Sequence, residues 1–243
     1  MSRDPMQIGT AHDGAIMANG TVVLVHSPLV GPTTWDPVAR ALVERGRQVA
    51  LPSLLGMEDS PAPFWRWAVD RLLHSLASEE GPLTLVAHSG AGPLLPIVGA
   101  EADREISSYV FVDATIPAPT GSTPVVPAEF LPSLEALVER GRLPRWSQWW
   151  DEGTMRALVP DDGLRRRLEE EMPSLPMAYF SEAIPVPTRW PDAPCAYILF
   201  SEAYEPVAAD ARFRGWPTRR IAGEHLHIVV DPESVAQALI EMV

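Results

Sequence analysis

The hydrophobic positions of the chain form short continuous runs that alternate with amphipathic segments. Most runs are rich in β-branched residues, which is typical of strands buried on both faces of a sheet. Strands are expected at residues 21–27, 48–51, 83–89, 109–114, 196–201 and 218–222. Apolar residues recur at helical spacing between them, at 36–45, 63–78, 93–102 and 232–242. Strands alternating with helices predict right-handed crossovers, and therefore an α/β fold with a mostly parallel sheet flanked by helices.

One proline-rich stretch, residues 116–193, breaks this alternation. It shows no clear strand and carries helical patterns at 129–140 and 163–172. Open α/β sheets bind their ligands at the carboxyl ends of the strands. We therefore interpret 116–193 as a helical lid over that edge, inserted into a core formed by residues 1–115 and 194–243. A second small domain with its own core is the alternative interpretation.

Three tryptophans of this stretch lie close together in the sequence. Trp146, Trp149 and Trp150 have spacings of three and four, which fit one face of a helix. They would form either the core of the lid or the wall of a cavity for an apolar or aromatic substrate.

Composition excludes several classes of function. Of the 243 residues 46% are hydrophobic, the formal net charge is -13 and the pI is about 4.8, so a folded protein that repels nucleic acid and anionic lipid is expected. Residues 1–13 lack the apolar segment of a signal peptide, and no apolar stretch reaches the roughly 18 residues of a membrane span. These features predict a cytoplasmic protein that binds neither nucleic acid nor membrane.

The basic residues and the cysteine narrow the chemistry further. All 19 basic residues are arginine, which excludes Schiff-base, pyridoxal-phosphate and P-loop lysines. Cys195 is the single cysteine, so an intramolecular disulfide and a zinc site with two thiolates are excluded. Arginine-only usage with abundant alanine and proline points to a GC-rich genome, in which such proteins often act on secondary metabolites.

The candidate nucleophile is Ser89, within AHSGAG at positions 87–92, where a buried strand runs straight into a helix. Small residues around a serine at such a turn are typical of a nucleophile elbow, which raises Oγ above the sheet and near a helix N-terminus. The alternative is an ordinary turn in which Ser89 caps the helix. His88 and His26 are expected to be structural side chains, the second bonding loop backbone.

The candidate general base is His225, which follows the last expected strand and lies six residues before Asp231. A histidine in this loop can reach over the sheet edge to a serine. His227 is expected to pack on or beneath the loop. The alternatives are a solvated loop histidine, or a metal site of His225, His227 and Asp113, which would leave Ser89 without a role.

At these motifs the chain resembles the α/β-hydrolase family over nearly its whole length. The resemblance includes the loop HSPLVGPTTW at 26–35, the Ser89 elbow, FVDATIP at 111–117 and the His225 loop, and the layout is similar to the small esterase and hydroxynitrile-lyase branch. It implies an α/β-hydrolase fold with an inserted helical lid and a Ser-His-acid site. It does not specify a reaction, because the fold also carries lyases, dehalogenases and receptors. Ser89 argues against a dehalogenase, whose nucleophile is an aspartate.

The third member of the site departs from the family pattern. The family commonly places an acid in a Gly-x-x-Asp turn after the strand that follows the lid, but this chain reads FSEAYE at 200–205. Asp113, at the end of the strand next to the nucleophile strand, is our prediction for the carboxylate that accepts from Nδ1 of His225. Glu205 and then Glu202 are the alternatives, and Asp113 could instead cap the first turn of the lid.

The oxyanion hole is the second departure. The resemblance implies one donor in the N–H of Gly90 and another in the residue two after His26, which is Pro28 and has no N–H. Three solutions remain open. The N–H of Leu29 serves after a shift of the loop, a hydroxyl of a loop threonine (Thr33 or Thr34) serves, or the chemistry needs no strong oxyanion.

These residues together predict a serine hydrolase for a small apolar or aromatic ester or thioester, with Ser89 as nucleophile, His225 as base and Asp113 as orienting acid. No cofactor or metal is required. A lyase or cyclase acting on a small carbonyl compound uses the same residues, and a ligand-binding protein with little turnover would suit Pro28 and the missing Gly-x-x-Asp turn. The expected partner is a small-molecule substrate, with a homodimer left open.

Overall fold

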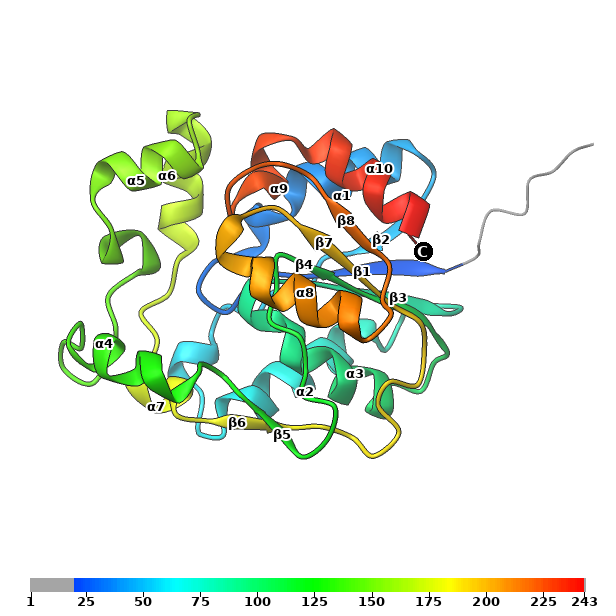
Figure 1. Cartoon of the computed structure of the whole chain (residues 1–243), viewed down its shortest axis with the longest axis horizontal. Coiled ribbons are helices and arrows are strands. Elements are labelled where there is room, and N and C mark those ends of the chain that lie inside the picture. Colours follow the sequence, from blue (N-terminus) through cyan, green and yellow to red (C-terminus); the bar gives the residue numbers. More distant parts are fainter. Residues whose placement is uncertain (1–19, 243) are drawn as a thin grey trace, which may run out of the picture.

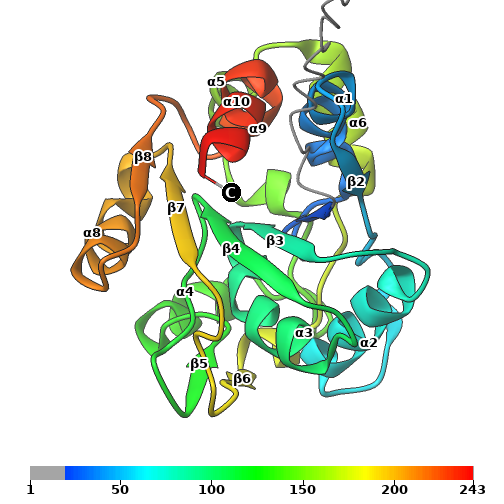
Figure 2. The same ribbon diagram turned by 90° about the vertical axis from the view of Figure 1, so that its right-hand side faces the viewer.

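A single parallel sheet organises the molecule. The computed structural model describes residues 20–242 and contains a six-stranded sheet of order β2-β1-β3-β4-β7-β8, in which every neighbouring pair is parallel (Figures 1 and 2). The strands are β1 (Thr21–Val25), β2 (Gln48–Ala50), β3 (Leu83–His88), β4 (Ile106–Val112), β7 (Cys195–Leu199) and β8 (Thr218–Arg220). Every strand expected from the hydrophobic runs is present, with ends that differ by a few residues, so the predicted parallel sheet is confirmed.

Helices cover both faces of this sheet (Figure 2). One face carries α1 (Asp36–Glu44), α9 (His227–Val230) and α10 (Pro232–Met242), and the other carries α2 (Phe64–Leu76), α3 (Leu95–Glu101) and α8 (Glu205–Phe213). Successive strand side chains point to opposite faces. Val22 and Leu24 therefore join the core beneath α1, whereas Val23 and Val25 join the core beneath α2.

The helix expected at 93–102 is interrupted at its start. The chain forms the 3-10 turn η3 (Ser89–Leu94) and becomes α-helical only from Leu95. Pro93 lies inside this turn and has no N–H to donate to a helical hydrogen bond, which accounts for the tighter first segment. The result is that Ser89 begins the helical segment directly after β3.

Residues 116–193 contain more strand than expected. Their helical elements are η4 (Ala128–Phe130), α4 (Leu131–Glu135), η5 (Trp146–Trp149), α5 (Glu152–Leu158), α6 (Asp162–Glu171) and α7 (Met177–Phe180). Two three-residue strands, β5 (Ser122–Pro124) and β6 (Ala183–Pro185), pair antiparallel across the two ends of the stretch. The expectation of no strand here is wrong, because strands this short, each containing proline, give no readable hydrophobic period.

The helix expected at 129–140 is also shorter than its pattern. It ends at Glu135, and the following chain turns back through Arg140 and Gly141, both with positive φ (51° and 82°). The division into a core and a lid at 116–193 stays a prediction, and residues 1–19, which include the segment considered for a signal peptide, lie outside the described residues.

Two glutamates attach the 116–193 segment to the rest of the molecule. The Glu171 carboxylate accepts from the N–H and the Oγ1 of Thr33 at 3.0 and 2.7 Å. The Glu182 carboxylate accepts from the N–H groups of Phe64 and Trp65 at 2.8 and 3.1 Å, where the first turn of α2 has unpaired donors. These contacts hold the segment beside the carboxyl ends of the strands, where it lies in Figure 1.

Candidate active site

Ser89 lies in a strained turn at the end of β3. Its φ is 57°, a left-handed value that is uncommon for a residue with a side chain, and its side chain is buried to 8% exposure. Gly92 is the glycine that this turn requires, since a methyl group there would lie 1.9 Å from the carbonyl oxygen of Thr115. The close approach of the two backbones explains why position 92 is glycine.

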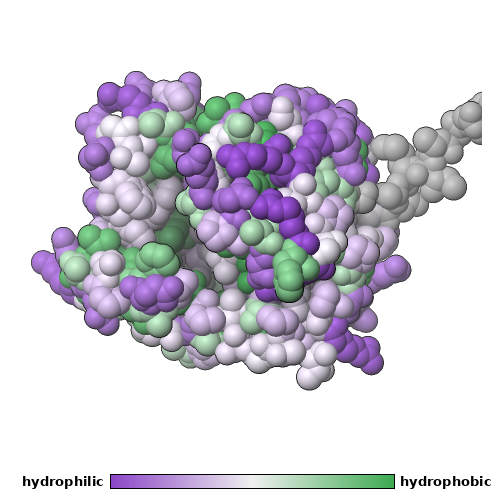
Figure 3. Space-filling model, in the orientation of Figure 1, coloured by the Kyte–Doolittle hydropathy of each residue, from purple (hydrophilic) through white to green (hydrophobic). Residues whose placement is uncertain are grey.

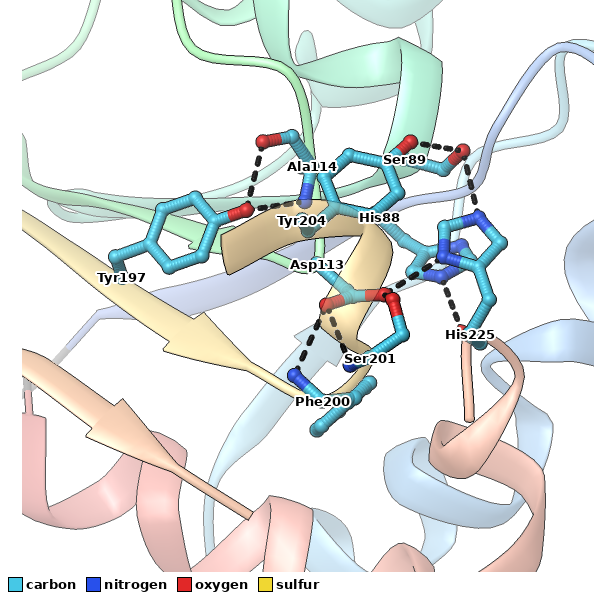
Figure 4. A network of polar contacts seen from close by, with 9 residues as sticks. All are labelled: His88, Ser89, Asp113, Ala114, Tyr197, Phe200, Ser201, Tyr204 and His225. Carbon is cyan, nitrogen blue, oxygen red and sulfur yellow. Dashed lines mark hydrogen bonds and ion pairs between the residues drawn. The ribbon is translucent and has the colours of Figure 1, made fainter. Parts of the chain in front are cut away.

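Ser89, His225 and Asp113 come together although they lie far apart in the sequence (Figure 4). The Ser89 hydroxyl lies 3.0 Å from Nε2 of His225, and Nδ1 of the same ring lies 2.8 Å from Oδ2 of Asp113. A carboxylate only accepts, so Nδ1–H donates to Asp113 and Nε2 is left to accept from the serine. This is the tautomer that a general base needs.

The Asp113 carboxylate is completely buried and fully hydrogen-bonded. Besides His225, it accepts from the N–H groups of Phe200 and Ser201 at 2.9 and 3.1 Å and from Oγ of Ser201 at 2.7 Å. Burial alone would raise the pKa of this carboxyl, but the hydrogen bonds from His225, Ser201 and Phe200 outweigh it and hold the pKa below its usual value. Asp113 is therefore an anion at neutral pH.

The alternative acids point elsewhere. Glu205 forms ion pairs with Arg212 and, at 3.1 Å, with Arg220 on the surface. Glu202 is exposed at the start of a 3-10 turn. Asp113 begins no helix of the segment that follows, so it does not act as the cap considered above.

Tyr204 is a site residue that sequence reasoning missed. Its ring is stacked on the His225 imidazole, with centroids 5.0 Å apart and planes 3° apart, and its hydroxyl lies 3.4 Å from Oγ of Ser89 (Figure 4). Burial raises the pKa of this phenol to about 12, so it is a hydrogen-bond donor at neutral pH. The available signal was its place in the turn after β7, where the family pattern has its acid.

Three other histidines, His88, His26 and His227, have structural contacts. Nε2–H of His88 donates to the carbonyl of His225 at 3.0 Å and so holds the His225 loop, while burial lowers the pKa of His88 to about 3. His26 donates from Nδ1 to the carbonyl of Ser27 and accepts at Nε2 from the N–H of Leu54, at 2.8 and 2.9 Å. His227 begins α9 and packs against the ring of Phe200, 5.5 Å between centroids.

The loop before Ser89 places the Pro28 ring beside the elbow. A methyl group added at Gly90 would lie 3.9 Å from Cδ of Pro28 and 3.7 Å from Oγ of Ser27. The N–H of Leu29 donates to Oγ of Ser27 at 3.3 Å, so the donor expected to replace the missing one already has a partner in its own loop.

A cleft opens onto Ser89 and His225. Its volume is about 360 Å³, and none of the described residues that line it is Asp, Glu or Arg. Trp146 and Trp150 form part of the wall opposite the strand ends, together with Thr154 and Leu158. Figure 3 shows an apolar hollow between the two parts of the surface. Such a cleft suits a small, uncharged, largely apolar molecule.

The three tryptophans do not share one helix face as expected. Trp146–Trp149 is a single 3-10 turn, and Trp150 follows it in an extended conformation. Trp149 faces a second apolar cavity of about 350 Å³ beside Phe130 and Phe180, which Trp150 also lines. Its Nε1 donates to the carbonyl of Pro144 at 2.9 Å. Trp146 and Trp150 alone line the cleft at Ser89, because the short turn rotates the middle residue away from them.

Within residues 20–242, no group of three or more His, Cys, Asp or Glu side chains is arranged to hold a metal ion. No helix of the same range is both long enough and apolar enough to cross a membrane.

The sequence profile of the alpha/beta hydrolase family matches residues 22–238, which is most of the chain. The protein belongs to the alpha/beta hydrolase family. The matched range includes every strand of the sheet except the first residue of β1, and it includes Ser89, Asp113 and His225. Among curated proteins, none is significantly similar in sequence.

Solved structures of this family share the fold at low sequence identity. An extracellular alpha/beta-hydrolase from a Paenibacillus species superposes with a TM-score of 0.73 at 17% identity, covering 91% of this chain and 98% of its own. A pyrethroid hydrolase from Sphingobium faniae has a TM-score of 0.65 at 22% identity, covering 91% and 96%. Polyneuridine aldehyde esterase has a TM-score of 0.68 at 17% identity, covering 92% and 98%. At these identities the likeness shows the fold alone.

Proposed function

We propose that this alpha/beta hydrolase family member is a serine hydrolase that cleaves small, neutral, apolar or aromatic esters or thioesters. The observation that carries the proposal is the chain of contacts from Ser89 through His225 to the buried carboxylate of Asp113. The names of the structural neighbours, which include an esterase and a hydrolase, agree with this class of reaction. The cytoplasm remains the proposed location.

In the proposed reaction Nε2 of His225 takes the proton of Ser89 as Oγ attacks the carbonyl carbon of the substrate. The N–H of Gly90 donates to the developing oxyanion, and the Asp113 carboxylate stabilises the imidazolium. The imidazolium then protonates the leaving alcohol or thiol. A water molecule, deprotonated by His225, attacks the acyl-enzyme and releases the acid, which restores the Ser89 hydroxyl.

The proposed substrate class follows from the wall of the cleft. Trp146 and Trp150 offer apolar ring surface, and no charged side chain among the described lining residues is available to pair with an ionic substrate. The volume of about 360 Å³ suits a small ester. A charged or strongly polar ester would lose water on entry without gaining a partner.

The direct test is covalent labelling combined with kinetics. A fluorophosphonate should add one adduct to the intact protein, and Ser89→Ala should abolish the adduct while the protein stays folded. Short p-nitrophenyl esters should give a burst of nitrophenol followed by steady turnover, lost by a factor of about 10⁶ in Ser89→Ala.

Other outcomes assign the same site differently. Labelling without a burst or steady ester cleavage would favour lyase or cyclase chemistry at Ser89. No labelling and no turnover would favour a ligand-binding protein. Either result overturns the proposed hydrolase.

A further inference from the structure

Pro28 leaves the proposed oxyanion site one donor short. Attack on an ester places negative charge on the carbonyl oxygen, and enzymes of this kind stabilise that charge with two or more converging donors. The N–H of Gly90 supplies one. The Pro28 ring lies beside Gly90, and it carries no N–H that could supply the second.

The other donors of the loop are already engaged. The Leu29 N–H donates to Oγ of Ser27 at 3.3 Å. The hydroxyl of Thr33 donates to Glu171 at 2.7 Å, and the hydroxyl of Thr34 donates to the carbonyl of Gly31 at 2.7 Å. None of the groups considered from the sequence is therefore free to bind an oxyanion.

Ser27 differs from all of these groups. It is 3% exposed, its side chain lines the same cleft as Ser89, and its Oγ lies beside Gly90. The oxygen accepts from the Leu29 N–H, but within residues 20–242 no acceptor is placed to receive the Ser27 hydroxyl proton. The buried Ser27 hydroxyl therefore accepts one hydrogen bond and donates none to the protein. Its O–H group is available to donate to a molecule bound in the cleft.

We propose that the hydroxyl of Ser27 is the second oxyanion donor and replaces the backbone N–H that Pro28 lacks. This assignment rests on the proposed function of Ser89. Ser27 donates a hydrogen bond and transfers no proton, so its side chain is unchanged by the reaction. The bond accepted from Leu29 polarises the O–H group and strengthens it as a donor.

The hydroxyl of Tyr204 occupies a different part of the site. Its ring is stacked on His225, and its oxygen lies 3.4 Å from Oγ of Ser89. Ser27 lies on the side of Gly90. Of the two hydroxyls, only that of Ser27 lies within 4 Å of a methyl group built at Gly90, which carries the first donor, so Ser27 is assigned and Tyr204 is not.

The experiment compares Ser27→Ala with Ser53→Ala. Oγ of Ser53 accepts from the N–H of Leu55 at 3.3 Å, the same local hydrogen bond that Ser27 makes with Leu29, but Ser53 does not line the cleft. Ser27→Ala should lower kcat for p-nitrophenyl acetate by about 10²–10³ with a smaller change in KM. It should weaken inhibition by phenylboronic acid by a similar factor, because the tetrahedral boronate on Ser89 places an oxygen in the oxyanion site. Ser53→Ala should change neither quantity.

Restoring the backbone donor provides the decisive variant. Pro28→Ala in the Ser27→Ala background returns an N–H to the position where the family has one. The kcat of this double variant should be at least tenfold higher than the kcat of Ser27→Ala. If Ser27→Ala does not fold, Ser27→Cys replaces it, since a thiol keeps the shape but is a weak donor. A Ser27 variant that folds, keeps the burst and retains kcat within about threefold overturns the assignment of Ser27 and leaves the proposed hydrolase intact. Absence of the burst in the wild-type protein overturns the proposed hydrolase itself.

Discussion

The two walls of the cleft are built in different ways. The wall formed by the strand ends carries Ser89 and His225, with Asp113 buried behind them, and hydrogen bonds from other elements of the core fix each of the three. The wall formed by the 116–193 segment presents Trp146 and Trp150, which contact each other edge to face with centroids 6.3 Å apart. Hydrogen bonds have a narrow geometry, whereas apolar contact tolerates displacement, so the first wall is positioned more precisely than the second.

This difference assigns different kinetic roles to the two walls. Substitutions in the strand-end wall should change kcat by similar factors for every ester, because they alter groups that act on the reacting atoms. Substitutions in the 116–193 wall should change KM, and by an amount that depends on the size of the substrate.

The largest effect after the nucleophile itself is expected for Asp113→Asn. The amide of asparagine can donate to Nδ1 of His225, which would favour the tautomer with the proton on Nε2, and that nitrogen could no longer accept from Ser89. Loss of kcat by about 10⁴ is expected for both small and bulky esters. Steady-state kinetics with two p-nitrophenyl esters of different size would measure it.

Ser201→Ala provides the control for Asp113. It removes one of the hydrogen bonds to the carboxylate but leaves the charge and the contact with His225. Its kcat should fall by less than tenfold. A loss in Asp113→Asn that is no larger than the loss in Ser201→Ala would contradict the role of Asp113.

The strand-end wall is also the part of the site that the sequence predicts best. Ser89 and His225 stand next to strands whose hydrophobic runs are unambiguous, so their place at the sheet edge followed from the order of elements. The contacts of the Tyr204 ring and the Ser27 hydroxyl cannot be predicted in this way, because they depend on side-chain directions that no periodic pattern encodes. In the 116–193 segment, the sequence spacing places Trp149 on one face with Trp146 and Trp150, because a 3-10 turn and a helix have similar spacing in the sequence.

The stability of the protein in acid should depend on His26, a buried histidine of the core. Burial lowers the pKa of His26 from 6.5 to about 4, so the folded protein keeps this ring neutral where the unfolded chain already binds a proton. The stability that depends on a neutral His26 is fully present above pH 6.5 and is lost as the pH falls toward 4. The difference between the pKa of 6.5 in the unfolded chain and the pKa of about 4 in the folded protein corresponds to about 3 kcal/mol in the free energy of unfolding, or about 10² in the folding equilibrium.

Urea unfolding at a series of pH values would measure this contribution. His26→Gln should flatten the dependence of the unfolding free energy on pH between 6.5 and 4, whereas the same change at the exposed His74 should not. Residues 116–193 contain no histidine, so no histidine of this segment contributes to the slope. An unaltered slope in His26→Gln would show that the acid sensitivity arises elsewhere.

Tyr204→Phe should have a smaller effect, confined to kcat. The change removes the hydroxyl 3.4 Å from Oγ of Ser89 and keeps the ring that is stacked on His225. Loss of one hydrogen bond of about 1 kcal/mol predicts a kcat about fivefold lower, again independent of ester size.

Tyr197→Phe is the matched control for Tyr204. Within the described part of the chain, the Tyr197 hydroxyl bonds only to the backbone of Ala114, at 3.1 and 3.0 Å, so its loss should lower the melting temperature and leave kcat unchanged. Equal losses of kcat in the two variants would mean that Tyr204 acts only through stability.

The smallest effect is expected on the tryptophan wall and gives the sharpest contrast with the other wall. Trp150 is 49% exposed and lines the cleft, so truncation to alanine removes apolar contact with a bulky ester without disturbing the hydrogen-bonded groups. KM for a naphthyl ester should rise about threefold to fivefold, which corresponds to about 1 kcal/mol of lost contact, while kcat and all constants for an acetyl ester stay close to wild type. Phe213→Ala, which truncates a 91% exposed ring on α8 away from the cleft, should change none of these constants. A Trp150→Ala variant whose kcat falls equally for both esters would mean that the tryptophan wall also positions the reacting groups, and the division of roles between the two walls would then be wrong.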